Sequence, residues 1–126
     1  MGQQQLLLIV LGVIVVGIAV ILGITIFRQN AIDQKRTLIS NESITLAMTA
    51  IEYYKKPAMF GGGGKSFTGW VVPAQIRNTP SGSYDATVFN DHVIIIGTGN
   101  ETVNGTDSVK VQTTVYPDSY TTTIIN

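Results

Sequence analysis

The feature that most constrains this chain is an uninterrupted apolar run at residues 6–27. These 22 residues include no charged side chain, and Thr25 is their only polar one. As an α-helix the run would be about 33 Å long, which is enough to cross the hydrocarbon core of a bilayer. A core helix of so small a protein would have a polar face, and this run has none. We therefore expect it to lie in a membrane or in an equally apolar protein environment.

The same run lacks the features of a cleaved signal peptide. The apolar core of a signal peptide has about 7–15 residues and follows a basic stretch, whereas residues 1–5 contain no Lys or Arg. We expect the run to remain in the mature protein. The basic residues at 28, 35 and 36 favour a cytoplasmic location for the chain that follows. Its composition, rich in Thr, Ser, Gly and Asn, favours the outside of the cell, which is the orientation that we predict.

Composition argues against several function classes. Eight Lys or Arg balance eight Asp or Glu, so no basic surface suggests a nucleic-acid partner. The chain has no cysteine and therefore no disulfide or thiolate metal site. His92, the only histidine, lies beside a predicted turn, where a surface role is commoner than a catalytic one. We predict that the chain is not an enzyme and that it uses no cofactor, metal or small-molecule substrate.

A helix is predicted to continue beyond the apolar run. Residues 28–54 contain no Gly or Pro, whereas two lysines and Pro57 follow and favour a helix end. The later apolar residues have the spacing of an amphipathic helix, namely Ile44, Ala47, Met48, Ile51 and Tyr54. We predict one helix over about residues 4–54. The alternative is that the polar residues 40–43 cap a second helix.

Short strands are predicted after Pro57. Candidate strands lie at about residues 70–76, 84–89, 93–96, 109–116 and 120–125. The dipeptides Asn90-Asp91 and Pro117-Asp118 predict tight turns between neighbouring strands. The predicted fold class is α+β, a long N-terminal helix followed by a small antiparallel β-sheet. We divide it into a stem (1–56), a glycine-rich connector (57–69) and a β head (70–126).

The connector contains part of a phosphate-binding pattern, the sequence Gly-Gly-Gly-Gly-Lys-Ser at residues 61–66. The full pattern requires glycine where Met59 stands, with a strand before it and a helix after it. Here a predicted helix comes first. We interpret the segment as a connector whose backbone donors are used in packing, and we predict that it binds no nucleotide.

Three Asn-x-Ser/Thr triplets suggest surface modification. Such triplets are acceptors of N-linked glycans in exported proteins, although they are common by chance. The candidate glycosylation sites are Asn41, Asn100 and Asn104.

A stem helix with an apolar first half and an amphipathic second half, followed by a small antiparallel sheet, resembles the type IV pilin superfamily. This superfamily includes bacterial pilins, secretion-system pseudopilins, archaeal pilins and archaellins. The resemblance covers residues 1–54 by architecture and composition, and the remainder only as β-rich. It implies a homopolymer whose stems bundle inside an extracellular filament. The subunit would reside in the inner membrane before assembly and then at the cell surface, with adhesion as one expected role.

A second interpretation remains open, a monomeric membrane-anchored accessory protein such as a pseudopilin. Under either interpretation the membrane is a partner, and under the first the chain's main partner is a second copy of itself. The residues expected in assembly contacts all lie near the N-terminus: Gln3, Gln4, Gln5, Leu8, Leu11, Gly12, Ile14, Gly17, Ile21 and Gly23. The three glycines permit close helix packing, with local unwinding during assembly as the alternative.

The resemblance also implies a glutamate four residues after the mature N-terminus, which pairs with a neighbour's terminal amine. With Met1 as the mature start, that position is Gln5. A glutamine amide accepts a hydrogen bond from an amine but does not neutralise its charge. We expect the glutamines at residues 3–5 to hydrogen-bond across subunits.

Overall fold

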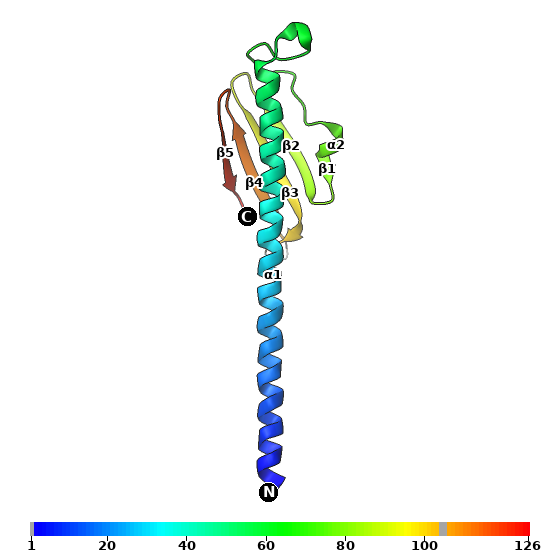
Figure 1. Ribbon diagram of the computed structural model, residues 1–126, viewed down its shortest axis with the longest axis vertical. Helices are drawn as coiled ribbons and strands as arrows, with labels where there is room; N and C mark the ends of the chain where they lie inside the picture. Colours follow the sequence, from blue (N-terminus) through cyan, green and yellow to red (C-terminus); the bar gives the residue numbers. More distant parts are fainter. Residues whose placement is uncertain (1, 104–105) are drawn as a thin grey trace. The chain divides into compact units, whose positions relative to one another are not determined.

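The computed structural model describes residues 2–103 and 106–126, and it begins with one long helix (Figure 1). This helix, α1, spans Gly2–Lys55 and has 54 residues. The single helix predicted for residues 4–54 is therefore confirmed, and α1 is not divided at residues 40–43. It is also continuous through Gly12, Gly17 and Gly23. The chain divides into two compact units between Ala31 and Ile32.

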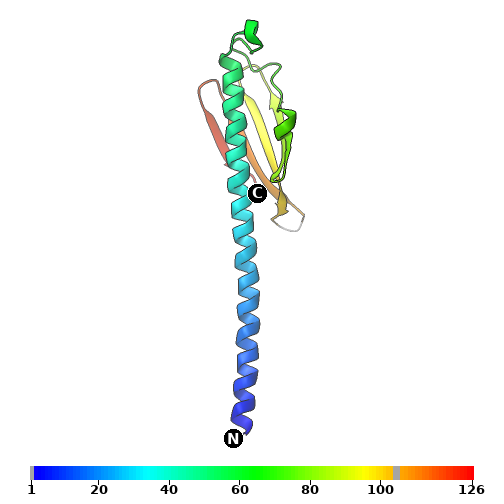
Figure 2. The ribbon, with the colours of Figure 1, turned by 45° about the vertical axis from the view of Figure 1, so that its right-hand side comes forward.

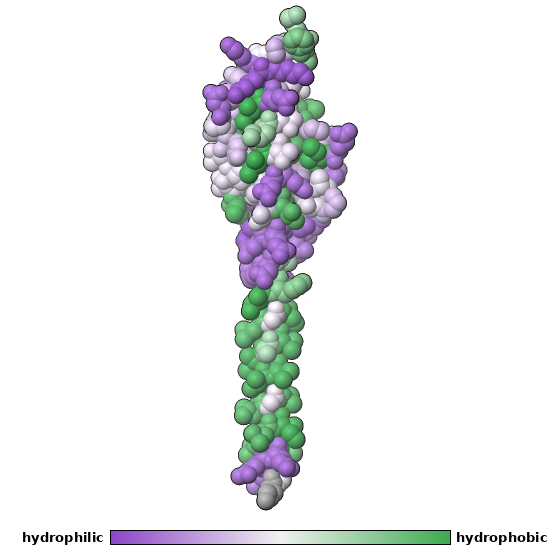
Figure 3. Space-filling model, viewed as in Figure 1, coloured by the Kyte–Doolittle hydropathy of each residue, from purple (hydrophilic) through white to green (hydrophobic). Residues whose placement is uncertain are grey.

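The N-terminal unit is the first part of α1, and its side chains are exposed. Every residue from 2 to 30 is exposed, and the large apolar side chains of residues 6–27 have exposed fractions between 53% and 75%. Figure 3 shows them as a nearly continuous apolar surface. The Thr25 hydroxyl donates a hydrogen bond to the Ile21 carbonyl at 3.0 Å, so its polar group is satisfied within the helix.

The C-terminal unit contains the rest of α1 and an antiparallel sheet that packs against it (Figures 1 and 2). The strand order is β1-β2-β3-β4-β5, a simple meander. The strands are β1 (Asn78–Thr79), β2 (Gly82–Val88), β3 (Val93–Thr102), β4 (Ser108–Val115) and β5 (Tyr120–Ile124). The predicted α+β fold class is confirmed. Both predicted turns are also present, closed by the bonds from Phe89 N to His92 O and from Tyr116 N to Ser119 O.

The core lies between one stripe of α1 and one face of the sheet. Buried positions on α1 recur every three or four residues, as one face of a helix requires, and buried positions on the strands alternate. The helix contributes Ile39, Ser43, Leu46, Ala47 and Ala50. The sheet contributes Tyr84, Val93, Ile95, Val109, Val111, Thr113 and Val115.

The strand predicted at residues 70–76 is wrong. Residues 70–73 form a loop, and the short helix α2 (Ala74–Arg77) follows directly. Pro73 has no backbone N–H group and so disfavours a strand here, and its carbonyl accepts hydrogen bonds from the amides of Ile76 and Arg77, which closes a helical turn. Trp70 and Val72 are nevertheless buried, so they contribute to the core from a loop.

Strand β3 is longer than predicted and continues through two glycines. The prediction ended at residue 96, whereas β3 ends at Thr102. A Cβ atom on Gly97 would lie 2.5 Å from Ile39 Cγ2, and one on Gly99 would lie 2.6 Å from Ile39 Cδ1. The two glycines therefore allow α1 to approach the sheet closely at Ile39, the kind of approach that glycine in a strand often marks.

The turn after α1 is built by a short 3-10 helix, η1 (Ala58–Phe60), and the glycines that follow it. Gly61 and Gly64 have φ values of 85° and 59°, in the left-handed region that glycine adopts at little cost. The connector thus reverses the chain direction and leads into the sheet.

Candidate functional site

The largest candidate surface is the apolar segment, which we define as residues 6–27 of α1. At about 100° of rotation per residue, Gly12 and Gly23 share one side of the helix, whereas Gly17 lies about 140° away from Gly12. An added Cβ atom at any of these glycines would meet no other atom within 4 Å in the single chain. The residues predicted to make assembly contacts are therefore distributed around the helix and do not form one stripe.

A helix that is apolar on every side requires an apolar environment on every side. Among the described residues, α1 is the one helix long and apolar enough to cross a membrane. This property is compatible with anchoring in a bilayer, and it is equally compatible with a bundle of several such helices. The glutamines at residues 3–5 precede the segment and are exposed in the single chain.

A second surface lies on α1 within the C-terminal unit, opposite the sheet. Between Arg36 and Glu52 the only charged residue is Glu42, and Glu42 turns toward the sheet. The exposed face between them carries no charge, and Leu38 and Met48 are 47% and 57% exposed there. We define this uncharged helix face by its exposed residues, which are Thr37, Leu38, Asn41, Thr45 and Met48.

The threonines on this face, and Thr49 beside it, satisfy their hydroxyl groups locally. Thr37, Thr45 and Thr49 donate hydrogen bonds to the carbonyls of Asp33, Asn41 and Thr45, at 3.0–3.1 Å. Their polar groups are therefore partly occupied before any neighbour arrives. Sequence reasoning missed this face, although the long interval with a single charge was a signal that could have found it.

Glu42 joins α1 to the first hairpin of the sheet. Its Oε2 atom accepts a hydrogen bond from Thr79 Oγ1 at 3.1 Å and another from the Tyr84 hydroxyl. Tyr84 is fully buried, and its burial, together with the bond to the Glu42 carboxylate, raises the pKa of Tyr84 well above its ordinary value. The phenol therefore stays protonated and remains a donor to Glu42. This contact orients the helix on the sheet.

The glycine-rich connector uses its backbone donors on α1. The amides of Gly63, Gly64 and Lys65 donate hydrogen bonds to carbonyls in the last turn of the helix or just after it, at 2.8–3.0 Å. These bonds satisfy carbonyls that a helix end leaves without partners. Amides used in this way are not free to bind a phosphate group, which favours the interpretation as a connector. That the segment binds no nucleotide stays a prediction.

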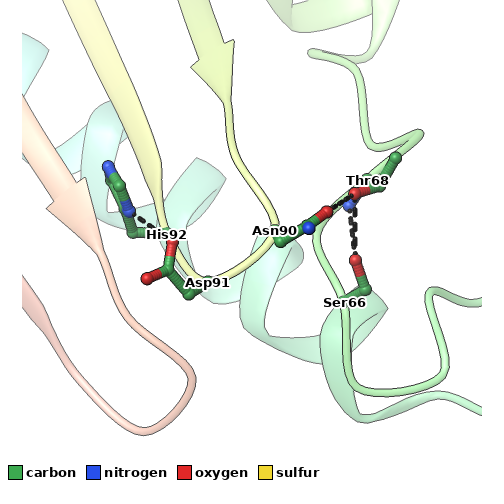
Figure 4. Close-up of polar contacts among 5 residues, drawn as sticks. All are labelled: Ser66, Thr68, Asn90, Asp91 and His92. Atoms are coloured by element: carbon green, nitrogen blue, oxygen red, sulfur yellow. Dashed lines mark hydrogen bonds and ion pairs between the residues drawn. The ribbon is translucent and has the colours of Figure 1, made fainter.

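His92 belongs to the turn between β2 and β3 (Figure 4). Its Nδ1 atom lies 2.7 Å from Asp91 Oδ1, and its ring stacks on Phe89 with 4.4 Å between the ring centres. The hydrogen bond from His92 lowers the pKa of the Asp91 carboxyl group. Neighbouring Asn90 accepts a hydrogen bond from the Thr68 hydroxyl and so ties the connector to this turn. In residues 2–103 and 106–126, no cluster of three or more His, Cys, Asp or Glu side chains could hold a metal ion.

The candidate glycosylation sites differ in their surroundings. Asn41 is exposed and forms part of the uncharged helix face. Asn100 is exposed in β3, but its Nδ2 atom donates a hydrogen bond to the Pro80 carbonyl at 2.8 Å. Asn104 lies outside the described residues. Glycosylation of all three stays a prediction.

The combination of a long N-terminal helix, apolar in its first half, with a five-stranded antiparallel sheet packed against its second half is a pilin-like architecture. It also places two exposed surfaces without charge on α1, the apolar segment and the uncharged helix face. Comparisons of the chain with protein-family models, with curated proteins and with solved structures found no match.

Proposed function

We propose that this chain is the structural subunit of an extracellular filament of the type IV pilus kind, and that it assembles through α1. The observation that supports this proposal is the apolar segment, which is exposed around its whole circumference in the single chain. Burying one Leu, Ile or Val side chain contributes about 1.5–3 kcal/mol. Lipid would cover the segment while the subunit resides in the inner membrane before assembly. In the filament, the apolar segments of several other copies would cover it.

The length of α1 favours a polymer over a simple membrane anchor. A bilayer span needs about 20 residues, whereas α1 has 54. A helix face in permanent contact with water normally carries charged or polar residues, whereas beyond Arg36 the uncharged helix face exposes Leu38 and Met48 by 47% and 57%. Neighbouring subunits that cover this face would explain why charge is missing from it. The proposed role is therefore structural, with other copies of the chain as its partners and with no catalytic activity.

The charge distribution is compatible with entry into a filament interior. No charged side chain occurs before Arg28, so the apolar segment can leave lipid for a helix bundle without transferring an ion into it. The glutamines at residues 3–5 retain amide groups, and these need hydrogen-bond partners once water is excluded. Contacts between the N-terminal ends of neighbouring copies would supply them.

The test replaces Ile14, near the middle of the apolar segment, with aspartate. An acidic residue near the centre of a spanning helix costs roughly 2.5–3.5 kcal/mol on insertion scales, and it would oppose several apolar neighbours in a bundle. We expect Ile14→Asp to abolish filaments in sheared cell-surface material examined by negative-stain microscopy. Met59→Asp is the matched control, because Met59 is 90% exposed in the C-terminal unit, and this variant should form filaments normally.

Mass spectrometry of the sheared material identifies the subunit, and membrane fractionation shows whether Ile14→Asp is still inserted. Normal filaments from Ile14→Asp would refute assembly through the apolar segment. If the unchanged chain stays in the membrane as a monomer and never appears in sheared filaments, the accessory-protein interpretation is the correct one.

A further inference from the structure

The two edges of the sheet are not equally protected. At one edge, β1 pairs with the first two residues of β2, and α2 contacts both of these strands. At the other edge, β5 pairs with β4 on one side, and no other described segment pairs with its outer side. Figure 1 shows β5 as the last strand of the sheet, opposite β1 and α2. Residues 84–88 of β2 have no strand partner on their outer side, so the first edge is partly paired, whereas the whole outer side of β5 is bare.

The sequence of β5 contains none of the features that protect an edge. Natural sheets blunt exposed edges with lysine, proline, bulges or very short strands. The five residues of β5 are Tyr, Thr, Thr, Thr and Ile, which are all strand-favouring residues. The strand pairs with β4 without a register shift. A bare, uncharged edge of this kind is a template for another strand.

We propose that β5 pairs antiparallel with β5 of a second copy, centred on Thr122, and that this contact joins two filaments side by side. The proposal rests on the filament function proposed above. Residues 84–88 of β2 carry the exposed charge of Asp85, which protects an edge, whereas β5 carries no charge, so the unprotected edge that a second copy offers is its own β5. Two identical strands related by a twofold axis pair antiparallel, so one continuous sheet would extend across both copies.

The register of this pair is self-complementary. Thr122 lies opposite Thr122 of the second copy, and Thr121 lies opposite Thr123 of the second copy. Tyr120 then lies opposite Ile124 of the second copy. Pairs of threonines and pairs of an aromatic with a β-branched residue are both favourable across antiparallel strands. No charged side chain opposes another within the five residues.

Charged groups that are already paired within the chain flank β5 at both ends. Asp118 precedes the strand; its side chain is 92% exposed, and its Oδ1 atom lies 4.0 Å from Lys55 Nζ. At the other end, the Arg36 Nε atom donates a hydrogen bond to the Asn126 carbonyl at 3.0 Å. Pairing centred on Thr122 brings Asp118 of one copy opposite Asn126 of the other, and therefore toward the Arg36 guanidinium group that binds it. At each end, the Lys55–Asp118 pair of one copy would therefore lie near the Arg36–Asp33 pair of the other, so charges of both signs are present and no like charges are directly opposed.

The orientation of the pair assigns it to contacts between filaments. Within the C-terminal unit, α1 and β5 run in nearly opposite directions along the same axis (Figures 1 and 2). A twofold pair of β5 strands therefore reverses the direction of the second C-terminal unit. Copies within one filament share one direction, so the pair requires a second filament that runs the opposite way, from the same cell or from another cell.

The size of the contact implies that it acts through many copies. A stable interface buries about 800 Å² on each partner, whereas β5 is a strand of about 17 Å. One such pair is weak when it forms alone. Repeated along two filaments, pairs that form within a tethered array gain from a high effective concentration. The result would be reversible bundling of filaments.

Cysteine cross-linking tests the register in the full-length chain, which contains no native cysteine. Directly opposed residues in an antiparallel pair have Cα atoms about 4.5–5.5 Å apart, within reach of a disulfide. Thr122→Cys filaments treated with a mild oxidant should therefore yield disulfide-linked dimers on a non-reducing gel. Thr121→Cys should yield few, because its two copies lie diagonally, beyond the roughly 7 Å limit of a disulfide. Mixed Thr121→Cys and Thr123→Cys material should form the hetero-dimer.

The outcomes separate this inference from the filament proposal, because the same preparations are imaged. Filaments without the Thr122→Cys dimer, or with equal dimer yields from Thr121→Cys, would overturn the pairing and leave the filament proposal intact. If no filaments form from the unchanged chain, the filament proposal fails, and the contact between filaments fails with it.

A second measurement does not depend on cysteine. The double variant Thr121→Lys/Thr123→Lys places lysines opposite each other in the proposed pair, where like charges repel. We expect this variant to form filaments that no longer sediment as bundles at low centrifugal speed. Thr87→Lys/Thr102→Lys adds the same charge at exposed positions of β2 and β3 and should sediment like the unchanged chain. Bundles from the β5 variant, or unbundled filaments from the unchanged chain, would refute the inference.

Discussion

Replacing Gly97 with alanine tests whether α1 packs on the sheet as closely as the structure describes. The added Cβ atom would lie 2.5 Å from Ile39 Cγ2 and 2.8 Å from Tyr84 Cε1. Ile39 and Tyr84 are both fully buried, and neither contacting atom is the free end of a flexible side chain. Because the helix or the Tyr84 ring must move, Gly97→Ala should destabilise the C-terminal unit by about 1–3 kcal/mol, the usual cost of overpacking.

Gly99 provides a graded comparison on the same strand. Its added Cβ atom would lie 2.6 Å from Ile39 Cδ1 and 2.9 Å from Lys35 Cγ. The Cδ1 atom is the end of its side chain, and the lysine side chain is flexible, so both can move at lower cost. Gly99→Ala should therefore be less destabilising than Gly97→Ala. Removing Cδ1 with Ile39→Val should further reduce the cost of Gly99→Ala, a coupling that a double-mutant cycle measures.

The assay is thermal unfolding of the full-length chain in detergent, followed by the fluorescence of Trp70. This is the only tryptophan, and it is 5% exposed in the core of the C-terminal unit. For a unit of this size, each kcal/mol lowers Tm by about 4–8 °C. Gly12→Ala is the control, because its Cβ atom would meet no other atom. A Tm for Gly97→Ala equal to or above that of the unchanged chain would refute the close packing.

Two further predictions concern polar groups. Replacing the glutamines at residues 3–5 with leucine should preserve membrane insertion but reduce filament yield or alter helical symmetry, because intersubunit hydrogen bonds are lost; unchanged yield and symmetry by electron microscopy would contradict this. Tyr84→Phe should cost about 1–3 kcal/mol at neutral pH, because the Glu42 carboxylate loses a buried donor. The raised pKa of Tyr84 means that its protonated hydroxyl stabilises the folded state fully below about pH 10, and that this stabilisation declines at higher pH. The loss of stability at alkaline pH should therefore be smaller in Tyr84→Phe than in the unchanged chain. Equal pH profiles of the two proteins would exclude this contribution.

The helix and the later strands could be predicted from the sequence because their signals are local. An unbroken apolar run followed by residues with helical spacing indicates one helix, and alternation indicates β4. The loop at residues 70–73 was misread because Trp70, Val71 and Val72 are strand-favouring residues. Trp70 and Val72 are buried, but their burial depends on tertiary packing, which no local pattern reveals.

The candidate surfaces also differ in how far local sequence predicts them. The apolar segment could be predicted because apolar character is a property of each side chain by itself. The uncharged helix face depends on the direction in which Glu42 points, and this direction is set by Thr79 and Tyr84, which are distant in sequence. Likewise, the bare edge of β5 follows from strand order, and strand order is a property of the whole sheet.

The position of Glu42 connects the stability of the C-terminal unit with the proposed assembly. Within the interval from Thr37 to Ile51 it is the only charge, and its hydrogen bonds to the hairpin hold it away from the exposed side of α1. The same contact therefore orients the sheet on α1 and keeps the uncharged helix face free of charge. A carboxylate on the exposed side would have to lose its water when a neighbouring subunit packed there, at a cost that an ion without a partner does not recover. A requirement for assembly would thus explain why this one charge is bound on the inner side of the helix.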